Sequence, residues 1–314
     1  MKKYRPLSFN KIKRYSLSKR KSKVKGSQTA SVFDKGGTFR DFMVSLPPIL
    51  AAKGIREVAE SIVSARNNGK PVILAMGAHP IKVGLSPIII SLIKNGIITA
   101  LSTNGATIVH DFEMSYLGKT SEEVARELNR GTFGMAEETG KLLNRAISRG
   151  VKKGLGLGGS IGEFISSGKS FRHRDLSILR AAHEEGIPAC IHVALGTDII
   201  HMHPEADGSS IGEGSMRDFR LLTSVVSDLD GGVFLNLGSA VIIPEVFLKA
   251  LTVARNLGNR VNDITTVTMD FIKQYRAVEN VLTRPTLKGG RSYFISGHHE
   301  INLPLLAAMI TEIS

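Results

Sequence analysis

The 314-residue chain has no tryptophan and a single cysteine, Cys190. One thiol cannot form an intramolecular disulfide, so a disulfide-stapled secreted scaffold is excluded, and so are zinc sites built from paired cysteines. Cys190 lies in an apolar run that predicts a buried strand, where a thiol behaves as a small apolar side chain rather than a catalytic thiolate. The chain also has no GxxxxGK[ST] string, which excludes a P-loop kinase.

Apolar runs long enough for a membrane span are missing as well. The richest one, residues 85–101, is interrupted by Lys94, Asn95 and Gly96, whereas a span needs about 20 consecutive apolar residues. A hydrophobic content of 42% is ordinary for a globular protein and is enough for a large core. We therefore expect a soluble, cytoplasmic protein.

Acidic residues are absent from positions 1–33, which hold eleven basic residues between Lys2 and Lys25. Removing those charges from the net charge of +13 leaves only +2 for the rest of the chain. Residues 1–33 are expected to form a disordered arm, because they bury too little apolar surface to offset the entropy of ordering. Two alternatives stay open: an arm that binds nucleic acid or another anionic partner nonspecifically, and a cleaved transit peptide.

From residue 34 onward, helical patterns alternate with short apolar runs typical of buried strands. Such alternation predicts one α/β domain over residues 34–314, a doubly wound, mostly parallel, Rossmann-like sheet with helices on both faces. The helices are expected at 55–66, 86–94, 175–185, 217–228, 244–257 and 304–313, and the strands at 71–79, 97–102, 187–195, 233–237, 264–269 and 292–296.

In a doubly wound fold the ligand lies beyond the carboxyl ends of the strands. Glycine and polar residues follow the expected strands at 77–79, 103–106, 196–198 and 238–240. These four segments are therefore the candidate site. A GxGxxG string at Gly154, Gly156 and Gly159 follows a helical segment and two lysines rather than a strand, so it predicts a flexible or substrate-approach loop more than a dinucleotide turn.

Five of the nine histidines fall in two segments, IHVALGTDIIHMHPE and SGHHE. His201 and His203 would share one face of an extended segment, with Asp198 nearby, which is compatible with a divalent metal site. The alternative is that these histidines are hydrogen-bonded near a cleft or bind a ligand directly.

Several segments taken in order resemble the deoxyhypusine synthase family over about residues 50–310. They read LSTNGATIVHD at 101–111, HEEGIP at 183–188, ALGTD at 194–198, LGSAV at 237–241 and NLPLL at 302–306. The resemblance implies an NAD-binding Rossmann-like fold, a homotetramer, and transfer of an aminobutyl group from a polyamine through hydride exchange with NAD. It also implies an NAD pocket lined by Ser102, Thr103, Gly105, Ala106, Asp111, Thr197, Asp198, Gly238 and Ser239.

The chain departs from that family where the chemistry is concentrated. The two acids expected before Asp111 are Val109 and His110, and the tryptophan-glycine-lysine segment with the catalytic lysine is not found. Lys288 lies in the corresponding region at a different spacing, and a nucleophilic lysine must be closely positioned to react. Deoxyhypusine synthase activity itself is therefore not expected.

Three functions stay open on the sequence. The first is an NAD-dependent transferase acting on a polyamine or another small amine, with His203, His299, Asp198 and Lys288 as candidate catalytic residues. The second is a non-catalytic dinucleotide-binding protein with a basic anion-binding arm. The third is a metal-dependent enzyme on the same fold, with His201 and His203 as ligands.

Overall fold

The computed structural model describes residues 2–314, which fall into two compact units. The first ends at Ile49 and the second runs from Leu50 to Ser314. In the first unit the exposed basic stretch contains only two short 3-10 turns, η1 (Leu17–Lys19) and η2 (Gly26–Gln28). The helix α1 (Phe39–Ser45) follows, and a reciprocal capping box between Thr38 and Asp41 fixes its start.

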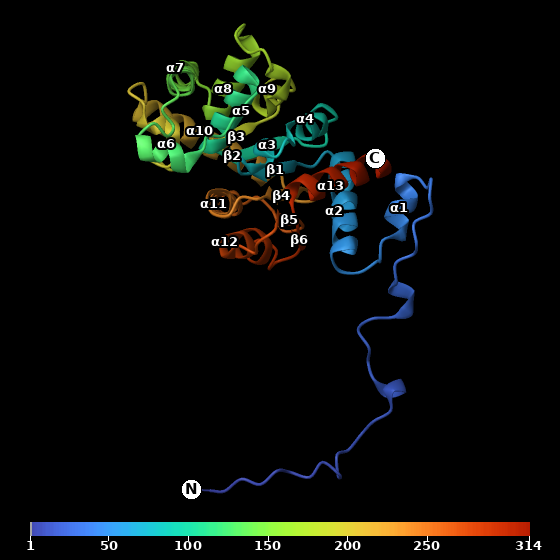
Figure 1. Cartoon of the computed structure of the whole chain (residues 1–314). Coiled ribbons are helices and arrows are strands. Elements are labelled where there is room, and N and C mark those ends of the chain that lie inside the picture. The colour runs from blue at the N-terminus through green and yellow to red at the C-terminus, as the bar shows by residue number, and fades with distance from the viewer. Residues whose placement is uncertain (1) are drawn as a thin grey trace. The chain divides into compact units, whose positions relative to one another are not determined.

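The second unit is built on one six-stranded sheet in which every pair of neighbouring strands is parallel (Figure 1). The strand order is β3-β2-β1-β4-β5-β6. The strands are β1 (Val72–Met76), β2 (Ala100–Asn104), β3 (Ala189–His192), β4 (Val233–Leu237), β5 (Thr265–Asp270) and β6 (Arg291–Ser296). The order reverses direction between β1 and β4, which is where open α/β sheets form their ligand crevice. The α/β class and the doubly wound sheet expected from the sequence are confirmed.

Helices connect the strands and cover the sheet, as parallel pairing requires. Those of the first half are α2 (Leu50–Asn67), α3 (His79–Lys82), α4 (Ser86–Lys94), α5 (Gly105–Leu117), α6 (Val124–Arg130), α7 (Glu137–Lys152) and α8 (Leu157–Ser167). Those of the second half are η3 (Arg174–Leu176), α9 (Ile178–Glu184), η4 (Ile199–Met202), α10 (Gly208–Ser227), α11 (Ile242–Asn256), α12 (Tyr275–Ala277), η5 (Val278–Thr283) and α13 (His299–Ile313). Among residues 2–314, no helix combines the length and the apolarity needed to cross a bilayer.

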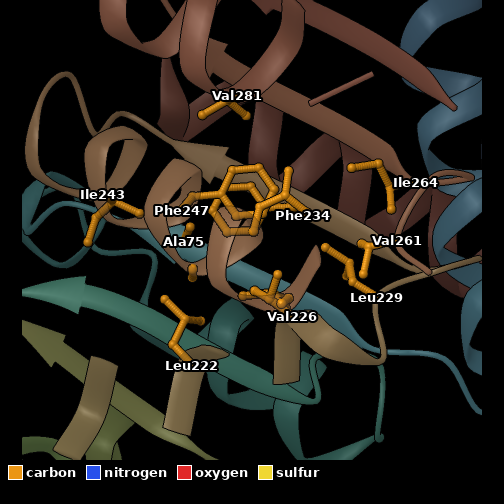
Figure 2. Packing of buried hydrophobic residues seen from close by; sticks show 14 of the residues in the cluster. Ala75, Leu222, Val226, Leu229, Phe234, Ile243, Phe247, Val261, Ile264 and Val281 are labelled. Atoms are coloured by element: carbon orange, nitrogen blue, oxygen red, sulfur yellow. The ribbon is translucent and has the colours of Figure 1, made fainter. Parts of the chain in front are cut away.

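The core between the sheet and helices α10, α11 and η5 is centred on two stacked aromatic rings (Figure 2). Phe234 of β4 and Phe247 of α11 have ring centroids 3.7 Å apart, and both side chains are fully buried. Val226 of α10 and Val281 of η5 belong to the same cluster. Burying a phenylalanine contributes roughly 2 to 3 kcal/mol, so this pair anchors α11 to the middle of the sheet.

Most of the predicted elements are present, with shifts at their ends. The helix at 86–94 and the strand at 233–237 have the predicted bounds. The strand expected at 97–102 begins later, at Ala100, because Ile97 and Ile98 are buried in the turn after α4 rather than in the sheet. The helix expected at 217–228 begins earlier, after Asp207, whose carboxylate accepts the amides of Ser209 and Ser210 as an N-cap.

The glycine-rich segment at 154–159, expected as a loop, is a turn up to Gly156 and the first turn of α8 from Leu157. The amides of Leu157 and Gly158 donate to the carboxylate of Asp218 from α10. A side chain at Gly156 would overlap that carboxylate. Ser160, which stands in a G-x-S-x-G string, is buried and donates to the carbonyl of Gly156 at 2.6 Å, so it is not an exposed nucleophile. The helix terminus that could have held a phosphate already holds a buried carboxylate.

We expect Asp218→Ala to destabilise the protein by about 3 kcal/mol, because it leaves several buried backbone donors without an acceptor. Besides α8, Asp218 accepts the amide of Ile191 in β3 at 2.9 Å. Denaturant unfolding would measure the loss, and Asp218→Asn, which keeps one acceptor oxygen, should lose less. The matched control is Asp228→Ala, since Asp228 is exposed and pairs only with Lys70 at the surface. Equal losses for Asp218→Ala and Asp228→Ala would contradict the capping role.

Candidate functional site

Two glycines come immediately after β1 and β4, at the strand-order reversal where doubly wound folds have their ligand crevice. The amide of Gly77 donates to the carbonyl of Leu237 at 3.4 Å, and the amide of Gly238 donates to that of Met269 at 3.0 Å. Gly238 has φ of +69°, in the left-handed region that favours glycine. A Cβ atom at Gly77 would lie 3.6 Å from the carbonyl oxygen of Gly238, and one at Gly238 would overlap the ring of His299, so glycine allows this close packing.

His299, the first residue of α13, closes one side of this crevice. Its Nε2 atom occupies the space where a side chain at Gly238 would begin. The His79 ring lies 5.6 Å away, centroid to centroid, and the buried Nδ1 atom of His299 has no hydrogen-bond partner. Burial lowers the pKa of His299, and Asp270 at the end of β5 opposes that shift. The imidazole is therefore held mainly neutral and can exchange a proton with a ligand.

A row of buried polar side chains crosses the sheet just below the crevice. Ser102, Ala75, Asn236 and Thr268 are in register on neighbouring strands. Ser102 Oγ, Asn236 Oδ1 and Thr268 Oγ1 are all buried without a hydrogen-bond partner. Buried polar groups are normally satisfied, so this row offers hydrogen bonds to a ligand or to ordered water.

Several residues of the predicted NAD pocket lie at the start of α5, next to this crevice. Thr103 hydrogen-bonds to Thr107, and Asn104 caps the helix by accepting the amide of Thr107. A side chain at Gly105 would overlap the carboxylate of Asp198, which approaches the helix terminus from the segment after β3. Ala106, Thr197 and Asp198 line a cavity of about 270 Å³ beside α5.

Other predicted residues are placed elsewhere. Asp111 is fully buried and accepts from Ser177 Oγ and the amide of Ile178 at 2.8 Å, so it caps α9 instead of facing the crevice. Lys288 precedes β6, at the amino edge of a parallel sheet whose crevice is at the carboxyl edge. The structure therefore does not bring Lys288 together with Asp198 or His299.

The two histidines suggested as metal ligands do not converge. His201 Nδ1 accepts the amides of Gly196 and Asp198 in its own loop. His203 Nε2 lies 2.8 Å from the carbonyl oxygen of Gly134. Within residues 2–314, no group of three or more His, Cys, Asp or Glu side chains is arranged to hold a metal ion.

Sequence reasoning missed three residues of this region: Asp270, His110 and Lys82. Asp270 ends a strand that the prediction stopped one residue too early. Lys82 and His110 line the cavity beside α5 from helices α3 and α5. The positions of Asp270, at a strand end, and of Lys82, five residues after Gly77, were usable signals, because the carboxyl ends of the strands form the ligand-binding edge.

No protein-family model matches this chain, and no curated protein sequence matches it. Solved structures do share its fold. The complex of AgrE with ornithine and NAD+ is 15% identical, with a TM-score of 0.55. A candidate LOR/SDH protein from Methanococcus maripaludis S2 is 17% identical with a TM-score of 0.53, and a candidate deoxyhypusine synthase from Entamoeba histolytica is 13% identical with a TM-score of 0.53.

The extent of the likeness differs among these structures. The match covers 83% of this chain and 33% of AgrE, so the chain spans about a third of the length of AgrE. It covers 84% of this chain and 71% of the Methanococcus protein, and 91% of this chain and 97% of the Entamoeba protein. At these identities the likeness establishes a fold related to that of deoxyhypusine synthase and LOR/SDH proteins.

His192, at the end of β3, is expected to make the protein sensitive to acid. Burial lowers its pKa from 6.5 to about 4, so the folded protein resists the protonation that the unfolded chain accepts below pH 6.5. Stability contributed by the neutral ring is therefore lost as the pH falls from about 6.5 towards 4. Between pH 7 and pH 5 the loss amounts to about 2 kcal/mol.

Urea unfolding at both pH values, compared with His192→Gln, measures this contribution. The variant should lose about 2 kcal/mol less than the parent protein between pH 7 and pH 5. His183→Gln, at an exposed position on α9, should behave as the parent does. An unchanged pH dependence in His192→Gln would show that His192 is not the group responsible.

Proposed function

We propose that the protein binds NAD across the β1–β4 crevice and is an NAD-dependent enzyme of the deoxyhypusine synthase type acting on a small amine. The observation that carries the proposal is the junction between β1 and β4, where Gly77 and Gly238 follow neighbouring strands beside a row of buried polar atoms without hydrogen-bond partners. Its position at the reversal of strand order is where dinucleotides bind in doubly wound folds.

The residues present fit a dinucleotide. Glycine at 77 and 238 places no side chain at the carboxyl edge of the sheet, where a phosphate or ribose would approach, and Ser102 and Asn236 offer buried hydrogen-bond partners. When bound, NAD would supply an acceptor for a hydride. His299 would hold or release a proton beside it through its unpartnered Nδ1 atom.

The resemblance to deoxyhypusine synthase supports a small amine as substrate. So do the carboxylates of Asp198, Glu113 and Glu122, which line the cavity beside α5. AgrE, whose solved complex contains ornithine and NAD+, shares the fold. Aminobutyl transfer through a lysine is not part of the proposal, since Lys288 lies at the opposite edge of the sheet. A homotetramer is proposed on the family resemblance alone.

The arm favours a second candidate function, contact with an anionic partner. Its eleven basic residues are not balanced by any acid, and lysine and arginine bind phosphates with release of counterions. This property is compatible with catalysis in the second unit and also with a non-catalytic dinucleotide-binding protein.

NAD at about 100 times its dissociation constant should raise the unfolding free energy by about 2.7 kcal/mol, seen as a higher melting temperature. Gly77→Val should abolish this rise, because the added methyl groups project into the crevice. The first of the added atoms, Cβ, lies 3.6 Å from the carbonyl of Gly238, an ordinary contact, so the variant is expected to fold. Gly212→Val, at an open position on α10, should keep the full rise. If NAD does not raise the melting temperature of the parent protein, the proposal is contradicted.

Binding of a single-stranded RNA oligonucleotide across a salt series tests the arm. Replacing Lys19, Arg20, Lys21, Lys23 and Lys25 by glutamine should reduce the slope of log affinity against log salt by roughly 3.5, at about 0.7 for each phosphate that is no longer neutralised. Replacing the four lysines among them by arginine keeps the charge and should leave the slope unchanged. The same slope in the glutamine variant would exclude this segment from binding.

A further inference from the structure

The cavity beside α5 is next to the crevice but separate from it. Helix α3 joins the two, since its first residue is the crevice histidine His79 and its last is Lys82 of the cavity lining. At about 270 Å³ the cavity suits a small metabolite. Its charged or titratable lining residues are Lys82, His110, Glu113, Glu122 and Asp198.

Hydrogen bonding fixes the orientation and tautomer of His110. The hydroxyl of Thr120 donates to Glu113 Oε2 at 2.6 Å, and the hydroxyl of Thr139 donates to Glu113 Oε1 at 3.0 Å. The Thr120 oxygen also lies 2.6 Å from His110 Nδ1. Its only proton is directed at the carboxylate, so the imidazole must donate through Nδ1. His110 Nε2 then carries the lone pair and can accept a hydrogen bond from a ligand.

The charges of the cavity are unbalanced. Burial and the neighbouring Lys82 lower the pKa of His110 to about 4, so the ring is neutral near pH 7. Three carboxylates then face a single cation. The Glu122 carboxylate accepts the amide of Gly134 at 3.1 Å. The Asp198 carboxylate accepts the amide of His201 in a capping box and has a long contact of 3.5 Å with Thr197. Lone pairs on both carboxylates are left for a cationic ligand.

Two further features set the character of the site. Lys82 is exposed at the mouth of the cavity and forms no ion pair within residues 2–314, so its ammonium group is available to an anionic group of a ligand. Ser121, also in the lining, has φ of +75°. A non-glycine residue in that region is strained, and such strain gathers at functional sites.

We propose that this cavity binds a small basic amino acid, with its carboxylate on Lys82 and its ammonium groups on His110 Nε2 and the carboxylates of Asp198 and Glu122. A compound with one carboxylate and two ammonium groups matches a lining of one cation and several carboxylates. A polyamine without a carboxylate would leave Lys82 unpaired beside its own positive charge. The inference rests on the proposed function, in which the amine is the substrate that NAD oxidises, and it names the class of that amine.

L-Ornithine and putrescine are matched probes, because they differ only by the carboxylate. In calorimetry on the full chain with saturating NAD, ornithine is expected to bind at least 10-fold more tightly than putrescine. Lys82→Gln should remove that preference, and Asp198→Asn should weaken both probes. Lys94→Gln, at an exposed lysine on α4 outside the cavity, should bind as the parent does.

Equal binding of the two probes, binding of neither, or a preference that survives in Lys82→Gln would overturn the inference. Displacement of ornithine by ADP-ribose would also overturn it, since the cavity would then belong to the dinucleotide. These outcomes are distinct from failure of the proposed function, which is read from the melting temperature with NAD alone. Lys82→Gln should leave that NAD effect unchanged.

A separate measurement tests whether Thr120 positions the ring of His110. Nitrogen-15 NMR of the histidine side chains should show His110 protonated on Nδ1. Thr120→Val, which has a similar shape but no hydroxyl, should lose that fixed tautomer and weaken ornithine binding while the protein stays folded. A His110 ring protonated on Nε2 in the parent protein would contradict the proposed arrangement.

Discussion

The parallel pairing of β1 with β4 is the interaction on which the rest of this molecule depends. These strands are far apart in the sequence, and the chain between residues 77 and 232 adds β2 and β3 on one side of β1 before it returns to place β4 on the other. The pairing runs over five residue pairs, from Val72↔Val233 to Met76↔Leu237. It therefore sets Gly77 and Gly238 next to each other and opens the crevice between them. The stacked Phe234 and Phe247 lie beneath that junction and fix α11 against it.

Two buried aspartates show how this chain uses the start of a helix. Asp111 caps α9 and Asp218 caps α8, each from a distant helix. Helix N-termini have amides that lack partners within the helix, and here carboxyl oxygens of the protein itself accept them. Both carboxyl groups have a pKa raised by burial, to about 6 for Asp111 and about 7 for Asp218. The N-termini of α8 and α9 are consequently used to hold the fold together.

The fold was largely predictable from the sequence because it depends on local patterns. Alternating helical and apolar segments identified the six strands, since a parallel strand buried on both faces is an uninterrupted apolar run. Strand ends were less predictable where a buried turn continues the run, as at Ile97. Between β2 and β3 the pattern identified the helix at 175–185, whereas α6 was beyond it because that helix has no buried residue and so no apolar face.

The site was predictable only in part, because its residues meet through tertiary contacts. The glycines after β1 and β4 follow from the strand pattern and the rule for doubly wound sheets. Asp111 was expected in the NAD pocket and the glycine-rich segment in a loop. Their partners in the structure, Ser177 and Asp218, are 66 and 60 residues away in the sequence, so no local pattern could identify them. Lys288 was placed by resemblance to the region of a family motif, whereas a residue before a strand lies at the opposite edge from the crevice.

In the proposed function, the two ends of the short helix α3 lie in different environments, one for the cofactor and one for the amine. At its start, His79 and His299 lie together beside Gly238, where the proposed function places an electron-accepting cofactor that carries phosphates. At its end, Lys82 belongs to a cavity rich in carboxylates, which would repel those phosphates and attract an ammonium group. An oxidation that moves a hydride from an amine to NAD needs both environments within one ligand length of each other. A helix of four residues is short enough to hold them at that separation.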